Sequence, residues 1–204
     1  MKRALLIATL LISMLVICAA CQTQLEQDIE VSEVGTIYFY SEEEFISAIK
    51  AAKENPTKDD FVNLAGVEFY YKPNKLPQGY ILYQVNVGKH DIGIVYLLEE
   101  DAASKESAMD AMGRLDYYML ITYRNTPFGT LKQELGLDEY AEKIVTGLTR
   151  NEFPEMYHYI GSPDTVFWGN DEVSMMLQYP ENSIDTKSLD SFYAEACAEY
   201  VEIP

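Results

Sequence analysis

Runs of β-branched and aromatic residues, joined by short turns, constrain the fold of this 204-residue chain more than any other feature. Three such runs follow one another at 67–71, 80–87 and 92–99, and the turn sequences KPNKLPQG and GKHD separate them. Successive strands with short connections pair in the antiparallel sense. The sequence therefore predicts a β-meander in the middle of the chain.

Further runs of the same kind predict strands at 36–40, 116–124 and 156–160, and a hairpin that turns at Gly169, Asn170 and Asp171. Helix-like composition at 101–115 and a mixed segment at 129–148 separate these runs. No repeat of fixed period occurs along the chain. The segments together predict an α+β domain that is built on an antiparallel β-sheet.

Two amphipathic helices are expected to pack on one face of this sheet. The first begins at Ser41 as N-cap, has Glu44 three residues later as a capping box, and ends at Asn55-Pro56. The second is expected from Ser188 to Val201. Its inner face would consist of Leu189, Phe192, Tyr193, Ala196 and Tyr200.

The N-terminus has the composition of a secretory signal. Lys2 and Arg3 precede an apolar run from Ala4 to Ile17, and small residues follow immediately before Cys21. The run is shorter than the roughly 20 apolar residues that cross a bilayer. The sequence therefore predicts that residues 1–20 are removed as a signal peptide.

Small residues directly before a cysteine resemble the lipobox of bacterial lipoproteins, in which a diacylglyceryl group is attached to the cysteine sulfur. The resemblance implies that Cys21 is lipidated and becomes the first residue of the mature chain, with Cys18 in the usual aliphatic position. Two or more acyl chains anchor a protein stably to a membrane. Cys18 and Cys21 also have Cys-x-x-Cys spacing, but a redox pair needs a strand-to-helix context and a zinc site needs further ligands. An uncleaved signal anchor is the remaining alternative.

The expected organisation is a signal peptide at 1–20, a lipidated cysteine with an acidic tether at 21–35, and one extracytoplasmic domain at 36–204. The net charge of the whole chain is −18, which disfavours binding to nucleic acid or to anionic lipid headgroups. With Cys21 lipidated, Cys197 is the one cysteine left, so no internal disulfide is expected. The predicted location is the extracytoplasmic face of the cell membrane.

The segment KLPQGYILYQVNV, with Leu76, Pro77, Gly79 and Tyr80 leading into a strand, resembles a Leu-Pro-x-Gly-Tyr family of unknown function. That family occurs in extracytoplasmic parts of Firmicutes envelope proteins, several of them similar to anti-sigma factors. The whole chain is similar to lipoproteins of gut Clostridia. The sequence has no cytoplasmic segment through which a sigma factor would be controlled, so the resemblance implies the fold and not the regulatory role.

Motifs that define common catalytic, metal or cofactor sites are absent from the sequence, and no metal or cofactor is expected. Ser47 and Lys50 have Ser-x-x-Lys spacing without the accompanying motifs of penicillin-interacting enzymes. His90 is expected in an exposed turn, and His158 in a half-buried strand with a hydrogen-bonded neighbour. Adjacent carboxylates occur in several places and are typical of solvated faces in so acidic a chain. Examples are Asp59 with Asp60, and Glu99, Glu100 and Asp101.

The chain contains 16 tyrosines, several in the aromatic runs 38–40, 69–71 and 117–118. Alternate residues of a strand point to opposite faces, so one member of a run is free to face solvent, where it would stack on sugars or hold peptides. Packing beneath helices is the simpler explanation of these runs. Two functional classes remain open: a non-catalytic binding or sensory lipoprotein with a peptide, protein or glycan ligand, and a wall or extracellular hydrolase that uses carboxylates and His158.

Overall fold

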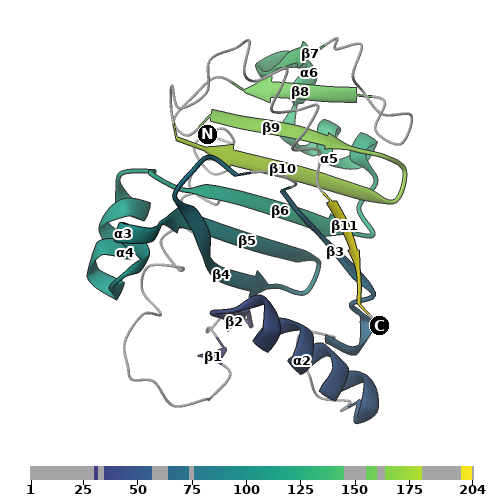
Figure 1. Cartoon of the computed structure of the whole chain (residues 1–204). Helices are drawn as coiled ribbons and strands as arrows, with labels where there is room; N and C mark the ends of the chain where they lie inside the picture. Colours follow the sequence, from purple (N-terminus) through teal and green to yellow (C-terminus); the bar gives the residue numbers. More distant parts are fainter. Residues whose placement is uncertain are drawn as a thin grey trace.

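The computed structural model describes residues 30–31, 35–56, 64–73, 76–144, 155–159, 164–180 and 199–203. Within these residues the chain is an α+β protein with a nine-stranded antiparallel sheet in the order β1-β2-β4-β5-β6-β10-β9-β8-β7 (Figure 1). The strands of this sheet are β1 (Glu30–Val31), β2 (Ile37–Phe39), β4 (Tyr80–Val87), β5 (Asp91–Leu98), β6 (Tyr118–Arg124), β7 (Glu142–Ile144), β8 (Glu155–Tyr159), β9 (Asp164–Gly169) and β10 (Val173–Tyr179).

Two further strands, β3 (Phe69–Lys72) and β11 (Glu199–Glu202), form a separate antiparallel ribbon that crosses the strands of the large sheet (Figure 1). The described helices are α2 (Glu42–Glu54), the 3₁₀ turn η1 (Leu64–Gly66), α3 (Glu99–Ala102), α4 (Lys105–Gly113), α5 (Phe128–Leu135) and α6 (Leu137–Tyr140).

The main core lies between one face of the large sheet and a layer made of α2, η1 and the β3–β11 ribbon. Phe45 and Ile49 of α2 are completely buried there, and Tyr70 of β3 is 1% exposed. They pack against alternate residues of the central strands, such as Ile94 and Leu120. The apolar face that the sequence predicts for the first helix is therefore its buried face.

The opposite face of the sheet carries two smaller clusters. Val95 and Leu97 of β5 pack with Ala108 and Ala111 of α4. The second cluster lies under α5 and α6 and contains Phe128, Leu131, Leu137, Tyr157, Phe167 and Met176. Helices therefore cover both faces of the large sheet.

Ser41 caps α2 as the sequence predicts. Its Oγ accepts a hydrogen bond from the backbone N–H of Glu44 at 3.1 Å, and Glu44 Oε2 accepts one from the backbone N–H of Tyr40 at 3.1 Å. The first half of the capping box is thus present, whereas Glu44 bonds the N–H of the residue before the N-cap rather than that of Ser41 itself. Gly136, with φ of 64°, ends α5 in the left-handed conformation that glycine adopts without strain.

The predicted meander is correct for the antiparallel pairing of β4 with β5 but wrong for β3. The strand at Phe69–Lys72 does not pair with β4, whose two neighbours are β2 and β5. Because β2 occupies the edge of β4, β3 instead lies over the face of the sheet and pairs with β11.

The predicted C-terminal helix is wrong over its last residues, because Glu199–Glu202 form β11. The alternation of this segment suits the ribbon: Val201 packs against the main core, whereas Tyr200 is 52% exposed on the other side. Cross-strand pairing with the aromatic β3 thus outweighs helical periodicity here. Residues 188–198 lie outside the described residues, and the helix expected there stays a prediction.

Two residues of the expected tether at 21–35 belong to the sheet. Glu30 and Val31 form β1 and pair with Tyr38 and Ile37 of β2. The sheet therefore begins within this range.

Candidate functional site

β3 contributes side chains to two different surfaces, because its residues alternate between the core side and the outer side of the ribbon. Tyr70 and Lys72 point toward the large sheet, where both line a pocket. Phe69 and Tyr71 lie on the outer side and are half-buried, and each contacts the ring of Tyr200 on β11; Tyr71 also packs against the main core. The two surfaces are described in turn.

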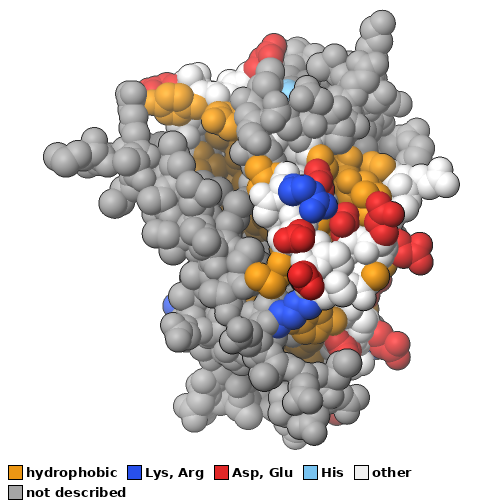
Figure 2. Space-filling model, turned by 90° about the vertical axis from the view of Figure 1, so that its left-hand side faces the viewer, with side chains coloured by type: hydrophobic (Ala, Val, Ile, Leu, Met, Phe, Trp, Pro, Cys, Tyr) orange, Lys and Arg blue, Asp and Glu red, His pale blue; other side chains and the backbone are white. Residues whose placement is uncertain are grey.

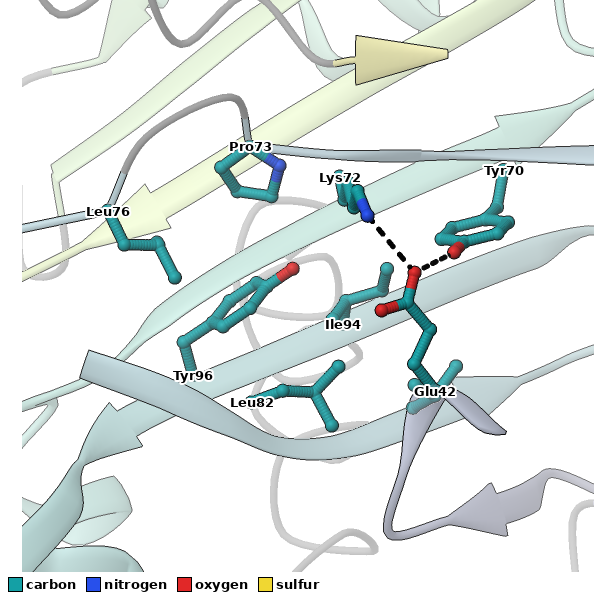
Figure 3. Close-up of a pocket in the computed structure, with 9 residues that line it drawn as sticks. Glu42, Tyr70, Lys72, Pro73, Leu76, Leu82, Ile94 and Tyr96 are labelled. Carbon is teal, nitrogen blue, oxygen red and sulfur yellow. Dashed lines mark hydrogen bonds and ion pairs between the residues drawn. The ribbon is translucent and has the colours of Figure 1, made fainter. Parts of the chain in front are cut away.

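The pocket has a volume of about 160 Å³ and lies between β3, the beginning of α2, and strands β4 and β5 (Figure 3). Its wall is largely apolar. The lining residues are Glu42, Tyr70, Lys72, Pro73, Leu76, Leu82, Val85, Ile94 and Tyr96.

Glu42 is the first residue of α2 and the one carboxylate among the lining residues. Its Oε1 accepts hydrogen bonds from the hydroxyl of Tyr70 and from Nζ of Lys72, the latter at 3.2 Å (Figure 3). The hydrogen bond from Tyr70 and, secondarily, the nearby Lys72 hold the pKa of Glu42 below its usual value, although burial acts in the opposite direction. Glu42 is therefore an anion at neutral pH.

Tyr96 supplies a second polar group to the pocket. The side chain is 6% exposed and its hydroxyl points into the pocket, toward the Glu42–Lys72 pair (Figure 3). No residue in the described part of the chain forms a hydrogen bond with this hydroxyl. Burial, together with the charge of Glu42, raises the pKa of Tyr96 well above its usual value, so the hydroxyl keeps its proton.

The outer side of the ribbon carries an aromatic patch, which we define as Phe69, Tyr71 and Tyr200. The ring of Tyr200 stacks on Phe69 at 5.2 Å between centroids and meets Tyr71 edge to face at 5.7 Å. Phe69 and Tyr71 are 5.8 Å apart. Glu202, which is exposed and pairs in register with Phe69, places a carboxylate on the same side. The patch is the result of cross-strand pairing between two aromatic strands.

Of the three aromatic runs, the run 69–71 divides as strand alternation predicts. In the run 69–71 Tyr70 is buried and its two neighbours belong to the patch, and in the run 38–40 only Tyr40 is exposed, at 47%. Both Tyr117 and Tyr118 are buried. Packing is thus the better explanation for most residues of these runs, and Tyr40, which follows the end of β2, is their one exposed member.

The histidines lie where the sequence predicts. His90 is exposed in the turn between β4 and β5. His158 is half-buried on β8, and its Nε2 lies 2.9 Å from the hydroxyl of the fully buried Tyr179. Burial lowers the pKa of His158, although Asp164 and Glu142 act in the opposite direction. Neither histidine is a lining residue of the pocket.

The other candidate residues for catalysis do not come together. Ser47 and Lys50 are exposed on α2, and Glu99 and Glu100 are exposed on α3. Asp101 forms an ion pair with Arg114 at 3.4 Å. On the side of the molecule on which α3 and α4 lie, the described surface shows acidic side chains interspersed with hydrophobic and basic ones (Figure 2). Cys18, Cys21, Asp59, Asp60 and Cys197 are outside the described residues.

The sequence did not single out Glu42, Lys72 or Tyr96 as site residues. In the sequence, Glu42 lies in the first turn of a predicted helix, Lys72 begins a turn and Tyr96 lies in a predicted strand, and none of these positions by itself indicates a site. The two-residue spacing of Tyr70 and Lys72 does place both on one side of a strand. Nothing in the spacing indicates that this side faces the first turn of α2, because that contact joins segments that are distant in the chain.

Comparison of the chain with family models, with curated proteins and with solved structures found no match. The described residues contain no group of three or more His, Cys, Asp or Glu side chains arranged to bind a metal ion. In the same residues, no helix combines the length and the hydropathy that crossing a bilayer requires.

Proposed function

We propose that this chain is a lipid-anchored, extracytoplasmic binding protein that holds a peptide segment of its partner on the aromatic patch. Diacylglycerol on Cys21 would attach the mature chain to the outer face of the cell membrane, as the lipobox-like sequence predicts. The observation that carries the binding role is the contact of three aromatic rings on the outer side of the ribbon, with Tyr200 52% exposed.

The chemistry of the patch favours a peptide with basic side chains. Aromatic faces attract lysine and arginine side chains through cation–π interactions. The exposed Glu202 beside Phe69 adds an ion-pair partner, and the chain carries a net charge of −18 that attracts cationic segments at long range. A neutral glycan would use the stacking surface but would gain nothing from these charges.

The arrangement of polar side chains supports binding over hydrolysis. A hydrolase of the predicted kind needs two carboxylates, or a carboxylate and a histidine, around one cleft. The pocket contains Glu42 as its single carboxylate, and Lys72 and Tyr70 both contact it. His158 is hydrogen-bonded to Tyr179 in a different part of the sheet.

We also propose that residues 188–198 form the predicted helix and that this helix lies on the same face of the large sheet as α2. Support comes from β11, which directly follows these residues and lies on the face that α2 covers.

Arrays of peptides and of wall and dietary glycans, probed with the full chain in detergent, test the proposal. We expect peptides rich in lysine and arginine to bind, and Tyr200→Ala to weaken their binding by about tenfold or more, the usual loss at an aromatic anchor. Tyr140→Ala is the matched control, since Tyr140 is 53% exposed on α6 and lies outside the patch.

Binding of glycans alone would assign the patch to sugars and reject the peptide proposal. Peptide binding that Tyr140→Ala and Tyr200→Ala weaken equally would show that the patch is not the binding surface. No binding on either array would reject the proposed function itself.

A further inference from the structure

We propose that the pocket beneath β3 binds a small zwitterion with a short apolar side chain, that is, a free α-amino acid of the size of valine or leucine. This site lies on the opposite side of β3 from the aromatic patch and is independent of the function proposed for that patch. The inference rests on the charges, the hydroxyl group and the size of the pocket.

The two charged groups of the pocket match the two charges of such a ligand. Glu42 Oε1 accepts two hydrogen bonds, whereas Oε2 accepts none from the described residues. Lys72 Nζ donates to Glu42 and keeps two further N–H groups. An α-ammonium group placed at Oε2 and an α-carboxylate placed at Nζ would each gain a charge-assisted hydrogen bond.

The hydroxyl of Tyr96 gives the pocket a further polar group beside the two charges. The side chain of Tyr96 is 6% exposed, and its hydroxyl points to the Glu42–Lys72 pair and has no hydrogen-bond partner among the described residues. The carboxylate of a bound amino acid would accept this hydrogen bond together with one from Lys72.

The remaining wall determines the side chain of the ligand. Leu82 and Ile94 lie across the pocket from Pro73 and Leu76, so a side chain between them is surrounded by apolar groups (Figure 3). A cavity of about 150 Å³ is known to accommodate benzene, and the volume here is about 160 Å³. A branched aliphatic side chain fits this space, whereas the indole ring of tryptophan together with the charged groups exceeds it.

Titration calorimetry with the full chain in detergent tests the inference with L-leucine as the probe. Two analogues serve as controls: 3-methylbutylamine, which lacks the carboxylate, and 4-methylpentanoate, which lacks the ammonium group. We expect saturable binding of leucine, with each analogue weaker by about tenfold, the value of one hydrogen bond to a charged group. Equal binding of either analogue, or no saturation by leucine at about 10 mM, a range that detects weak small-ligand affinity, would overturn the inference.

Variants of the pocket provide the second test. Glu42→Gln keeps the shape of the side chain and should weaken leucine binding by about tenfold, and Tyr96→Phe should weaken it by about fivefold. Tyr117→Phe is the control, because Tyr117 is 4% exposed but belongs to the cluster on the opposite face of the sheet. A thermal melt of each variant establishes that it is folded. Leucine binding that a folded Tyr96→Phe protein retains in full would contradict the proposed site.

Tyr200→Ala separates this inference from the proposed function. The substitution removes a ring of the patch on the outer side of the ribbon and should leave leucine binding unchanged. Loss of leucine binding in a folded Tyr200→Ala protein would contradict the independence of the two sites.

Discussion

The hydroxyl of Tyr179 on β10 lies 2.9 Å from Nε2 of His158 on β8, although β9 separates the two strands in the sheet. The two rings stack with centroids 6.4 Å apart, and Tyr179 stacks on Tyr118 of β6 at the same separation. Tyr80 of β4 then meets Tyr118 edge to face at 4.6 Å. A row of rings from four strands, β4, β6, β10 and β8, therefore runs along the core side of the sheet and ends at a titratable group.

We expect this histidine to make the protein less stable in mild acid. Burial holds the pKa of His158 in the folded chain below its value in the unfolded chain, so the unfolded state binds the proton more readily. The free energy of unfolding should therefore be highest above the unfolded pKa, about 6.5, and fall as the pH drops through and below it. Urea denaturation at about pH 7.5 and about pH 5.5 measures this loss. His158→Gln should show a smaller loss, and parallel profiles for the two proteins would contradict the prediction.

Replacement of the helix cap should destabilise the protein. Ser41→Ala removes the acceptor for the N–H of Glu44 and should lower the free energy of unfolding by about 1 kcal/mol. Ser47→Ala is the control within α2, since Ser47 is exposed and alanine is favoured in a helix interior. Denaturant midpoints for both variants test this difference, and equal midpoints would show that the cap contributes nothing.

Substitution by alanine should change the stability of the protein in opposite directions at two glycines. A Cβ on Gly169 would overlap the carbonyl oxygen of Val173 and lie 2.9 Å from Cβ of Phe128, so Gly169→Ala should destabilise by about 1–3 kcal/mol. A Cβ on Gly129 in α5 meets no atom within 4 Å, and Gly129→Ala should stabilise by up to about 1 kcal/mol. Thermal melts measure both changes. A stable Gly169→Ala protein would show that the hairpin of β9 and β10 is looser than described.

Thr122→Val should stabilise the protein. Thr122 is 1% exposed, between Ile92 and Met175 in the strand register, and its Oγ1 has no hydrogen-bond partner among the described residues. Valine has nearly the same shape without the unpaired hydroxyl, so we expect a gain of about 1 kcal/mol in the free energy of unfolding. A loss of stability in urea denaturation would mean that the hydroxyl has a partner, such as an ordered water molecule.

Cys21→Ala should abolish lipid attachment. We expect a labelled fatty acid to be incorporated into the wild-type chain in a bacterial host and not into Cys21→Ala, which should be found outside the membrane fraction. Cys18→Ala and Cys197→Ala should keep both the label and the membrane location. Unchanged labelling of Cys21→Ala would disprove the lipobox interpretation.

The sequence predicts local structure well where neighbouring residues determine it. The bounds of β4, the turn between β9 and β10, and the cap at Ser41 all follow from composition and turn chemistry within a few residues. The ribbon does not follow from such information. β3 and β11 pair across almost the whole domain, and the side chain of Tyr200 suits a helix face as well as an outward strand position.

The pocket could not be predicted for the same reason. The ion pair of Glu42 with Lys72 joins α2 to β3, and Tyr96 lies on a third element. The sequence around each of these residues is explained by its helix, turn or strand alone. The site arises only because the fold brings together residues that are far apart in the chain. The contacts of the patch follow in part from the sequence, because strand alternation by itself places Phe69 and Tyr71 on the same side.

The pairing of β3 with β11 also determines the order in which the protein can fold. β3 emerges during synthesis and export long before β11, so its N–H and C=O groups have no partner strand in this ribbon until most of the large sheet has been produced. Lys53 of α2 donates to the carbonyl of Ile203 at 2.9 Å, so the same late segment also fixes α2. The ribbon is thus complete only when Glu199–Glu202 are present, and the same segment adds Val201 and Ile203 to a main core whose other residues all come earlier in the chain.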